Sequence, residues 1–236
     1  MQQVRKMLMA ENVRQATVAI VLDGIRKEAL LGDFEGERQI GETEVATEYQ
    51  VSRSSVRTAF QILERDGLIE IQPNGRKLLK KIDAKYIEDL CITRSILECE
   101  AVRLIIKKDD CDFSELLQCV ARFYLEDKKP QSKERTNNLS LINDQFHNTL
   151  FLMAENRALL QCWCTLAPMI LTIVRLNTTI DLELNEHGYY ESHKKITEML
   201  MERDTAVVDY IRYHATNATK NDIMLAIKKL SSERKS

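Results

Sequence analysis

Apolar residues recur at the spacing of an α-helix between residues 52 and 66. Those that would share one face of this helix are Val56, Ala59, Phe60 and Leu63. Ser52, ahead of the first apolar position, is a favourable N-cap, and Gly67 can take the left-handed conformation that ends many helices. The pattern therefore predicts a helix with a defined buried face.

Shorter elements are predicted on either side of this helix. The residues from 42 onward predict a short helix and a tight turn ahead of it. After it, residues 69–72 and 77–80 are typical of strands, and the Pro73-Asn74-Gly75 sequence between them favours a turn. The chain therefore predicts a winged helix-turn-helix.

The outward face of the longer helix is polar and basic near its N-terminus. Its residues are Arg53, Ser54, Arg57, Thr58 and Gln61. Arginine can pair with O6 and N7 of guanine, and Ser or Thr can bond to a base or a phosphate. Basic residues also surround the turn of the wing, where they suit phosphate contact: Arg76, Lys77, Lys80 and Lys81. The alternative is that these side chains are only the solvated face of an amphipathic helix.

Glycine usage divides the chain into two parts. Six of the seven glycines precede residue 76, and only Gly188 follows. The second part is therefore predicted to be all helix. We expect a mainly α protein, with a winged helix-turn-helix domain at residues 1–82 and an all-helical antiparallel bundle at residues 83–236. The helices predicted in the bundle span residues 84–107, 112–127, 137–154, 156–178, 183–202 and 204–231, with a polar loop at residues 128–136.

Length and composition limit the classes to which the protein can belong. A chain of 236 residues, 44% of them hydrophobic, allows two modest domains with their own cores. Neither a secretory signal nor an apolar run of membrane-spanning length is evident, so we expect a cytoplasmic protein without a membrane partner. Residues 1–82 carry 13 Lys and Arg against 12 Asp and Glu. DNA affinity should then depend on local placement of charge and on dimerisation.

All four histidines lie in the second part of the chain. Asn143 and His147 are four residues apart, which puts both on one face of a helix. His193 and His214 are 21 residues apart, as expected if adjacent antiparallel helices present them at similar depth. Three imidazoles and an amide oxygen would bind a divalent metal ion such as zinc, nickel or manganese and leave a position open. The alternative is that each histidine is a hydrogen-bonded core or surface residue.

The six cysteines show no paired spacing of a metal site. They occur in apolar helical patterns at Cys91, Cys99, Cys111, Cys119, Cys162 and Cys164. We interpret them as reduced thiols in the core, with a redox switch as the alternative.

A family pattern is evident in the first 82 residues. Its residues are Ile40, Glu42, Glu44-Val45-Ala46, Val51-Ser52-Arg53, Val56-Arg57, Ala59, Leu63 and Asp66-Gly67-Leu68. This pattern resembles the GntR superfamily of transcription regulators over residues 12–82. Ser55 and Thr58 depart from it, since many members have proline and glutamate there. The residues that the resemblance places at the DNA are Thr43, Arg53, Ser54, Arg57 and Gly75.

The second part resembles the helical FCD effector domain of the FadR-type branch. The residues that match are Arg94, Glu98, Asn143, Phe146, His147, Asn156, His193 and His214. The resemblance implies a divalent metal, with zinc favoured, held by Asn143, His147, His193 and His214, and an effector that coordinates it through a carboxylate. Asp is more usual at position 143, and Asp144 is the alternative ligand.

A cationic side chain should assist the effector carboxylate. Arg94 and Arg175 are the arginines set in otherwise apolar helical stretches. Each could instead reach the surface or pair with a local glutamate such as Glu98.

We therefore expect a ligand-responsive transcription regulator, not an enzyme, that binds a near-palindromic operator as a homodimer and responds to a small carboxylate. Effector binding would change the spacing of the two winged helices. One alternative is a metal-dependent enzyme acting on a small organic acid, because three histidines and an open position also describe hydrolases. Another is a regulator whose second domain only dimerises.

Overall fold

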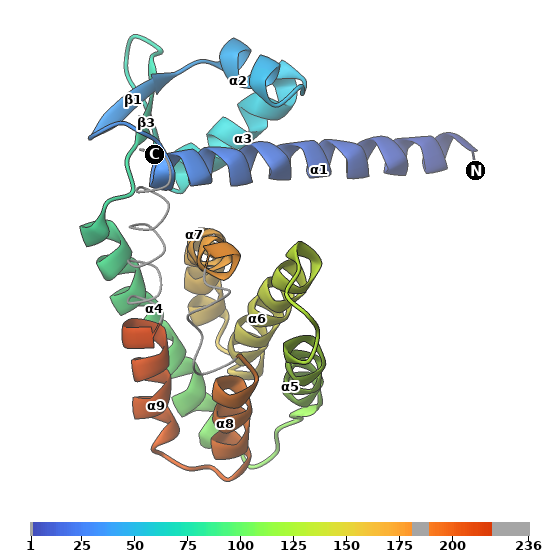
Figure 1. Cartoon of the computed structure of the whole chain (residues 1–236), viewed down its shortest axis with the longest axis vertical. Helices are drawn as coiled ribbons and strands as arrows, with labels where there is room; N and C mark the ends of the chain where they lie inside the picture. The colour runs from blue at the N-terminus through green and yellow to red at the C-terminus, as the bar shows by residue number, and fades with distance from the viewer. Residues whose placement is uncertain (1, 181–188, 219–236) are drawn as a thin grey trace. The chain divides into compact units, whose positions relative to one another are not determined.

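A computed structural model describes residues 2–180 and 189–218 of the chain, with side chains at residues 15–132, 134–170 and 189–216. The chain divides into two compact units, Met1–Asp83 and Ala84–Ser236 (Figure 1). Within these described residues, no helix is both long enough and apolar enough to cross a membrane.

The first unit combines helices with a small antiparallel sheet. Its elements in chain order are α1 (Gln2–Leu31), β1 (Glu37–Ile40), α2 (Glu42–Glu48), α3 (Arg53–Arg65), β2 (Ile69–Ile71) and β3 (Lys77–Lys80). β3 is the central strand, paired with β1 on one side and β2 on the other. Lys77 lies opposite Ile40 of β1 and Ile71 of β2. The two strands β2 and β3 form the predicted wing.

Helix α1 closes the core of this unit. Val21, Ile25 and Ala29 are buried along one side of α1, which packs against α3. β1 was not among the predicted strands, because its four residues, Glu37 to Ile40, include only one apolar side chain. Its pairing with β3 makes it a strand.

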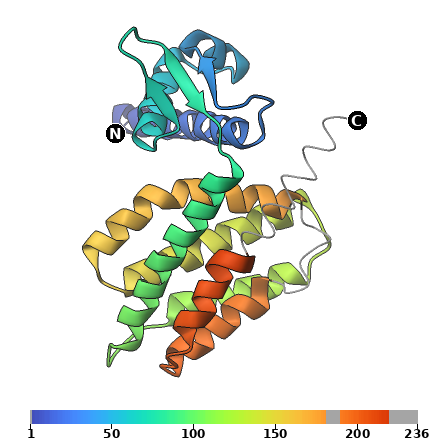
Figure 2. The ribbon, with the colours of Figure 1, turned by 90° about the vertical axis from the view of Figure 1, so that its left-hand side faces the viewer.

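The second unit is a bundle of helices. Its elements are α4 (Ala84–Ile106), α5 (Ser114–Asp127), α6 (Lys133–Met153), α7 (Arg157–Ile180), α8 (Tyr189–Met201), α9 (Val207–Tyr213) and a π-helical turn, η1 (His214–Ala218). α4 packs against α7 and α9, and α5 packs against α6 and α8 (Figures 1 and 2). The prediction of a mainly α chain with a winged helix-turn-helix is confirmed.

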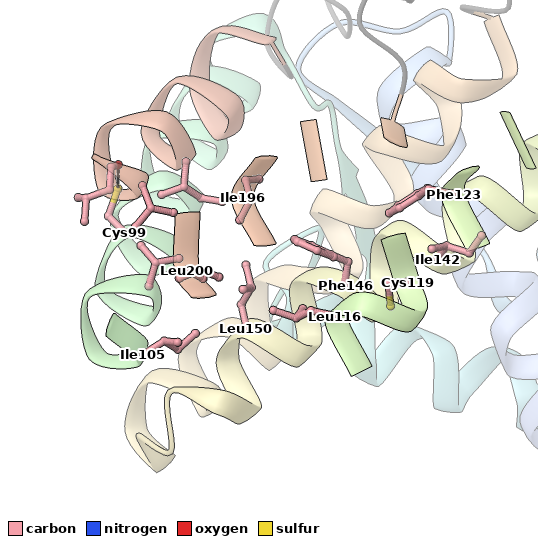
Figure 3. Packing of buried hydrophobic residues seen from close by; sticks show 14 of the residues in the cluster. Cys99, Ile105, Leu116, Cys119, Phe123, Ile142, Phe146, Leu150, Ile196 and Leu200 are labelled. Carbon is pink, nitrogen blue, oxygen red and sulfur yellow. Dashed lines mark hydrogen bonds between the residues drawn. The ribbon is translucent and has the colours of Figure 1, made fainter. Parts of the chain in front are cut away.

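A continuous apolar cluster holds the helices of the second unit together. Phe123 of α5, Phe146 of α6 and Ile196 of α8 are fully buried in it (Figure 3). Burial of each such side chain contributes roughly 1.5–3 kcal/mol. A smaller cluster around Trp163 and Phe151 joins α7 to α6.

Several helix boundaries differ from those predicted. α6 begins at Lys133, inside the predicted loop, because the Ser132 side chain accepts a hydrogen bond from the Arg135 N–H at 3.1 Å. The helix predicted at 204–231 is α9 followed by the π-helical turn η1, and the remainder of that prediction, residues 219–231, lies outside the described residues. The first residues of the predicted helix 183–202 lie outside them as well.

The cysteines are free thiols, and only some of them belong to the core. Cys91, Cys99 and Cys119 are buried, whereas Cys162 and Cys164 are exposed. The prediction that all the thiols are in the core was therefore wrong for the last two. Trp163 takes the buried position between them, and a helix turns its neighbours about 100° to either side.

Candidate functional site

Helix α3 begins and ends as its sequence predicts. The Ser52 side chain accepts a hydrogen bond from the Ser55 N–H at 3.1 Å, which caps the helix. Gly67 has φ +77°, the left-handed conformation that follows a helix. The apolar face that includes Val56 and Phe60 is fully buried. The opposite face of α3 is therefore the one that can contact a ligand.

The predicted DNA-reading side chains of α2 and α3 are exposed. The side chains of Arg53 and Arg57 are 64% and 61% exposed. Ser54 is exposed and its hydroxyl lies 2.8 Å from that of Ser52. Thr43 is exposed on α2. The first unit thus presents basic and hydroxyl groups at the N-terminal end of α3, the end that a recognition helix places in the major groove.

The wing has a tight turn with basic residues beside it. Gly75 has φ +81° and its N–H donates to the Gln72 carbonyl at 2.8 Å. The Asn74 side chain accepts from the Arg76 N–H at 3.0 Å. Arg76 is exposed and Lys77 follows it in β3. A side chain larger than hydrogen is disfavoured at Gly75, because φ is positive there.

Glu42 connects these elements, although sequence reasoning gave it no role of its own. Its carboxylate lies 3.1 Å from the Arg57 guanidinium, 3.4 Å from the Lys77 ammonium and 4.0 Å from the Arg53 guanidinium. The hydrogen bond from Arg57 holds the pKa of Glu42 below its ordinary value. Acidic residues at a helix start are common, so the sequence held no signal that distinguished Glu42 from Glu44.

In the second unit, three predicted metal ligands come together. His147 lies on α6, His193 on α8 and His214 at the start of η1. One ring nitrogen from each falls in a group whose members all lie within 4.8 Å of one another. The ring centroids are 5.1–5.6 Å apart. Residues 46 and 21 positions apart in the sequence thus share one site, and π-helical turns such as η1 are frequent at functional sites.

His193 is oriented by its own helix. Its Nδ1 lies 2.6 Å from the Tyr189 carbonyl oxygen. Because a carbonyl oxygen only accepts, Nδ1 carries the proton and Nε2 carries the lone pair. That Nε2 is buried and has no hydrogen-bond partner. The ring centroids of Phe123 and Phe146 lie 4.5 and 4.7 Å from the centroid of the imidazole. Packing therefore also sets the orientation of His193.

His147 belongs to a buried ionic network with Arg94 and Glu98 of α4. Its Nδ1 lies 3.0 Å from the Glu98 carboxylate and its Nε2 lies 2.9 Å from an Arg94 nitrogen. The guanidinium can only donate, so Nε2 accepts and Nδ1 donates to Glu98. Arg94 also donates to Glu98 at 2.7 Å. A metal ion bound at Nε2 of His147 would therefore require Arg94 to withdraw.

The electrostatic surroundings favour neutral imidazoles. Burial holds the pKa of His193 well below 6.5, and the two neighbouring histidines lower it further. Burial lowers the pKa of His214 to about 3. The pKa of His147 is also lowered, because burial outweighs the attraction of Glu98. Neutral imidazole is the form that coordinates metal ions.

Three other residues were predicted for this site, namely Asn143, Asp144 and Arg175. Asn143 is buried one turn before His147 on α6. Asp144 is largely buried, and its charge raises the pKa of His147, so it lies close to that ring. The Arg175 side chain lies outside the described residues.

The donor set of the cluster fits a divalent cation. Three neutral imidazoles from separate elements suit zinc, nickel or other borderline ions. Two of the three are held at Nδ1 by an acceptor, a backbone carbonyl for His193 and a carboxylate for His147. This is the usual support of a metal-binding histidine. The Nε2 of His193 carries a lone pair that could bind a metal ion. It has no hydrogen-bond partner among the described residues.

Two protein families match the chain. The FCD domain family matches residues 89–217, and the bacterial regulatory proteins of the gntR family match residues 17–77. The first match alone covers more than half of the chain.

Individual relatives agree with these matches. The HTH-type transcriptional regulator YdhC of Bacillus subtilis (strain 168), itself uncharacterized, is 29% identical over 135 residues, which span 57% of this chain and 59% of YdhC. The match thus covers less than two thirds of that relative. The Nta operon transcriptional regulator of Aminobacter aminovorans is 26% identical over 168 residues, 71% of this chain and 75% of that protein.

A solved structure supports the fold. The crystal structure of a GntR-type regulator from Rhodococcus sp. RHA1 matches with a TM-score of 0.61 at 20% sequence identity. The match covers 90% of this chain and 98% of the other.

Proposed function

Because the chain belongs to the GntR family of bacterial transcription regulators and carries an FCD domain, we propose that it is a metal-containing regulator that senses a small carboxylate. The winged helices of a homodimer would read a near-palindromic operator. The observation that carries the metal and effector part is the buried, unpartnered Nε2 of His193 within a group of three histidines.

The proposed cation is a divalent metal, with zinc the best match to three imidazoles. His147, His193 and His214 would hold it, with Asn143 or Asp144 as an oxygen ligand. When bound, the cation would offer an open position to a carboxylate oxygen. The buried nitrogen of His193 supports this assignment, because a polar atom left without a partner in a protein core costs about 1–3 kcal/mol.

Arg94 is the proposed contact for the effector carboxylate. Its guanidinium bridges Glu98 and Nε2 of His147. If a metal ion takes Nε2 of His147, the guanidinium loses that acceptor and keeps Glu98. The N–H group released from His147 could then donate to a carboxylate oxygen. Arg94 would in this way link metal occupancy to effector binding on α4. Arg175 is a second proposed contact, assigned from sequence alone.

The proposed DNA contacts are Thr43, Arg53, Ser54, Arg57, Gly75, Arg76 and Lys77. The exposure of both arginines at the start of α3 supports base reading, and the wing suits phosphate contact. One winged helix offers too small a surface for tight specific binding, so two should act on half-sites about one helical turn apart.

A metal-dependent enzyme is the second candidate, favoured by the three histidines. The argument against an enzyme is that the carboxylate beside the histidines is a poor general base. Glu98 is in contact with His147. Burial raises the pKa of Glu98, but the charge of Arg94 and the hydrogen bonds from Arg94 and His147 outweigh it and lower that pKa to about 2. Such a carboxylate is a poor proton acceptor at neutral pH. Turnover of organic acids by metal-loaded protein would support this candidate.

The proposal is tested by metal content and DNA binding in the same preparations. Protein purified without chelators should contain about one equivalent of metal by mass spectrometry. His193→Ala and His214→Ala should lose it and lose the response to carboxylic acids in a thermal-shift screen, while still binding DNA. Thr197→Ala is the matched control, because Thr197 is buried one turn after His193 and bonds to its carbonyl.

Different failures have different meanings. Metal-free wild-type protein, with no stabilisation by zinc, nickel or manganese, would contradict the metal site. Metal retention without any carboxylate response would contradict the effector. A monomer by light scattering, both alone and on DNA, would contradict the homodimer.

A further inference from the structure

We infer that Glu42 is a positioning residue for DNA recognition, which holds Arg57 of the recognition helix and Lys77 of the wing in one fixed arrangement. The inference rests on the DNA-reading role proposed above for α3 and the wing. It concerns specificity, because Glu42 would act through these two side chains and not by touching DNA.

The contacts of Glu42 join three separate elements of the first unit. Its carboxylate reaches Arg57 and Arg53 of α3 and Lys77 of β3, within 4.0 Å in each case. The Glu42 side chain is 14% exposed, whereas the side chains of Arg53 and Arg57 are each more than 60% exposed. The anion therefore lies beneath the cations that face outward.

The backbone explains why Glu42 occupies this place. Ile40, the last residue of β1, lies opposite Lys77 of β3. Gly41 then caps α2 with an extended conformation, and Glu42 is the first residue of that helix. The strand register thus brings the start of α2 to Lys77, and the packing of α2 on α3 brings it to Arg57.

The Glu42 carboxylate is poorly placed to contact a DNA base itself. A glutamate can accept a hydrogen bond from N4 of cytosine, but this carboxylate is mostly covered and is already paired with cations on two elements. Arg57 differs, because one of its terminal nitrogens bonds to Glu42 while its side chain is 61% exposed. The guanidinium carries further N–H donors that can bond to O6 and N7 of guanine.

Holding Arg57 before binding should improve discrimination. A long, unrestrained arginine loses rotamer entropy on any DNA sequence and can adapt to different bases. An arginine fixed by a carboxylate offers its donors in one geometry, which fits the correct base better than the others. The carboxylate also opposes phosphate electrostatically. Glu42 should therefore lower affinity for DNA in general and raise the preference for the correct sequence.

A purely structural role is the competing explanation. Glu42 and Glu44 are both acidic residues in the first turn of α2, where negative charge stabilises a helix. The Glu44 side chain is 57% exposed and pairs with Arg38 at 3.9 Å. A structural role predicts that the two neutral variants behave alike on DNA. Glu44→Gln is therefore the matched control for Glu42→Gln.

The test uses the full-length protein and DNA that it selects itself. A duplex is first selected from a randomised pool by the wild-type protein. Fluorescence anisotropy then gives Kd for that duplex and for a scrambled one, and the specificity is the ratio of the two. The variants are Glu42→Gln, Glu44→Gln, Arg57→Ala and the double variant Glu42→Gln/Arg57→Ala. Circular dichroism checks that each is folded.

Glu42→Gln should lower the specificity about fivefold or more, with binding to scrambled DNA unchanged or tighter. Glu44→Gln should stay within about twofold of wild type, since exposed charge pairs contribute little. In the Arg57→Ala background, Glu42→Gln should cause little further loss, because its effect passes through Arg57. Glu42→Asp keeps the charge but withdraws the carboxylate by one methylene, and it should give an intermediate specificity.

Wild-type specificity in Glu42→Gln, or an equal loss in Glu44→Gln, overturns the inference and leaves the DNA-reading role intact. If the wild-type protein selects no sequence at all, the DNA-reading role fails and the inference fails with it. If Glu42→Gln does not fold, the outcome for Glu42→Asp decides, and an unchanged specificity in that variant overturns the inference.

Discussion

The Nδ1 of His193 lies 2.6 Å from the carbonyl oxygen of Tyr189, one turn earlier in α8. This contact fixes the tautomer of a buried imidazole and leaves Nε2 as an acceptor without a partner. Proteins rarely leave such an atom unsatisfied in the core. The divalent cation proposed above, shared with His147 and His214, would account for it. The surrounding residues then yield predictions that separate metal binding from ordinary packing.

Glu98→Gln should weaken metal binding without removing a ligand. Glu98 accepts from Nδ1 of His147, and a carboxylate in that place both orients the ring and makes it a better donor to a metal. The glutamine amide can keep one hydrogen bond but carries no charge. Zinc affinity, measured by calorimetry, should fall roughly 10–100-fold.

Glu100→Gln is the control for this experiment. Glu100 lies two residues later on α4, and its side chain is 47% exposed in an ion pair with Arg103. Its replacement should leave zinc affinity unchanged. Equal affinities of wild type and Glu98→Gln would show that Glu98 only offsets the buried charge of Arg94.

Two substitutions on α6 distinguish Asn143 from Asp144 as the oxygen ligand of the proposed metal ion. If Asn143 is the ligand, Asn143→Asp should tighten metal binding, because a charged oxygen replaces an amide oxygen at the same position. If Asp144 is the ligand, Asp144→Asn should weaken binding and Asn143→Asp should have little effect. Calorimetric titration with zinc and manganese measures both, and no change in either variant would leave the imidazoles as the only protein ligands.

The recognition helix could be predicted from the sequence because its determinants are local. The cap at Ser52, the buried face around Phe60 and the stop at Gly67 all lie within one short segment. The spacing of Val18 and Val21 carries a similar local signal for α1. Four residues of β1, in contrast, become a strand only through pairing with β3.

The site was predictable only in part. His147, His193 and His214 could be grouped by helical spacing and by resemblance to a family. The contact between Arg94 and His147 could not, since 53 residues separate them and the packing of α4 on α6 alone brings them together. Glu42 was hidden for the same reason, because its partners come from two other elements.

Acid should destabilise the metal-free protein through its histidines. In the unfolded chain their pKa is about 6.5, whereas in the folded protein burial lowers the pKa of His193 and lowers that of His214 to about 3. Below the unfolded value, the unfolded chain binds more protons than the folded one. The free energy of unfolding should therefore decrease as pH falls from about 7 and level off near the folded pKa values.

Urea unfolding of chelator-treated protein at several pH values measures this loss. His214→Asn should take up about one proton fewer on unfolding in the same range, because one titrating group is removed. A free energy of unfolding that stays constant between about pH 7 and pH 5 would mean that the histidines are not buried as neutral groups.

Loss of Asp66 should destabilise the first unit from within. Asp66 lies at the C-terminal end of α3, and its carboxylate is 2.7 Å from the Arg26 guanidinium of α1, with both side chains less than 10% exposed. Asp66→Ala leaves a buried arginine without its anion, which should cost about 3 kcal/mol or more. Hydrogen exchange of the α1 and α3 amides is the suitable measurement, because the single tryptophan, Trp163, reports on the second unit.

Asp23→Ala is the control, since its pair with Lys27 is exposed and its loss should cost less than about 1 kcal/mol. Similar exchange rates in the two variants would show that the buried pair contributes no more than a surface one.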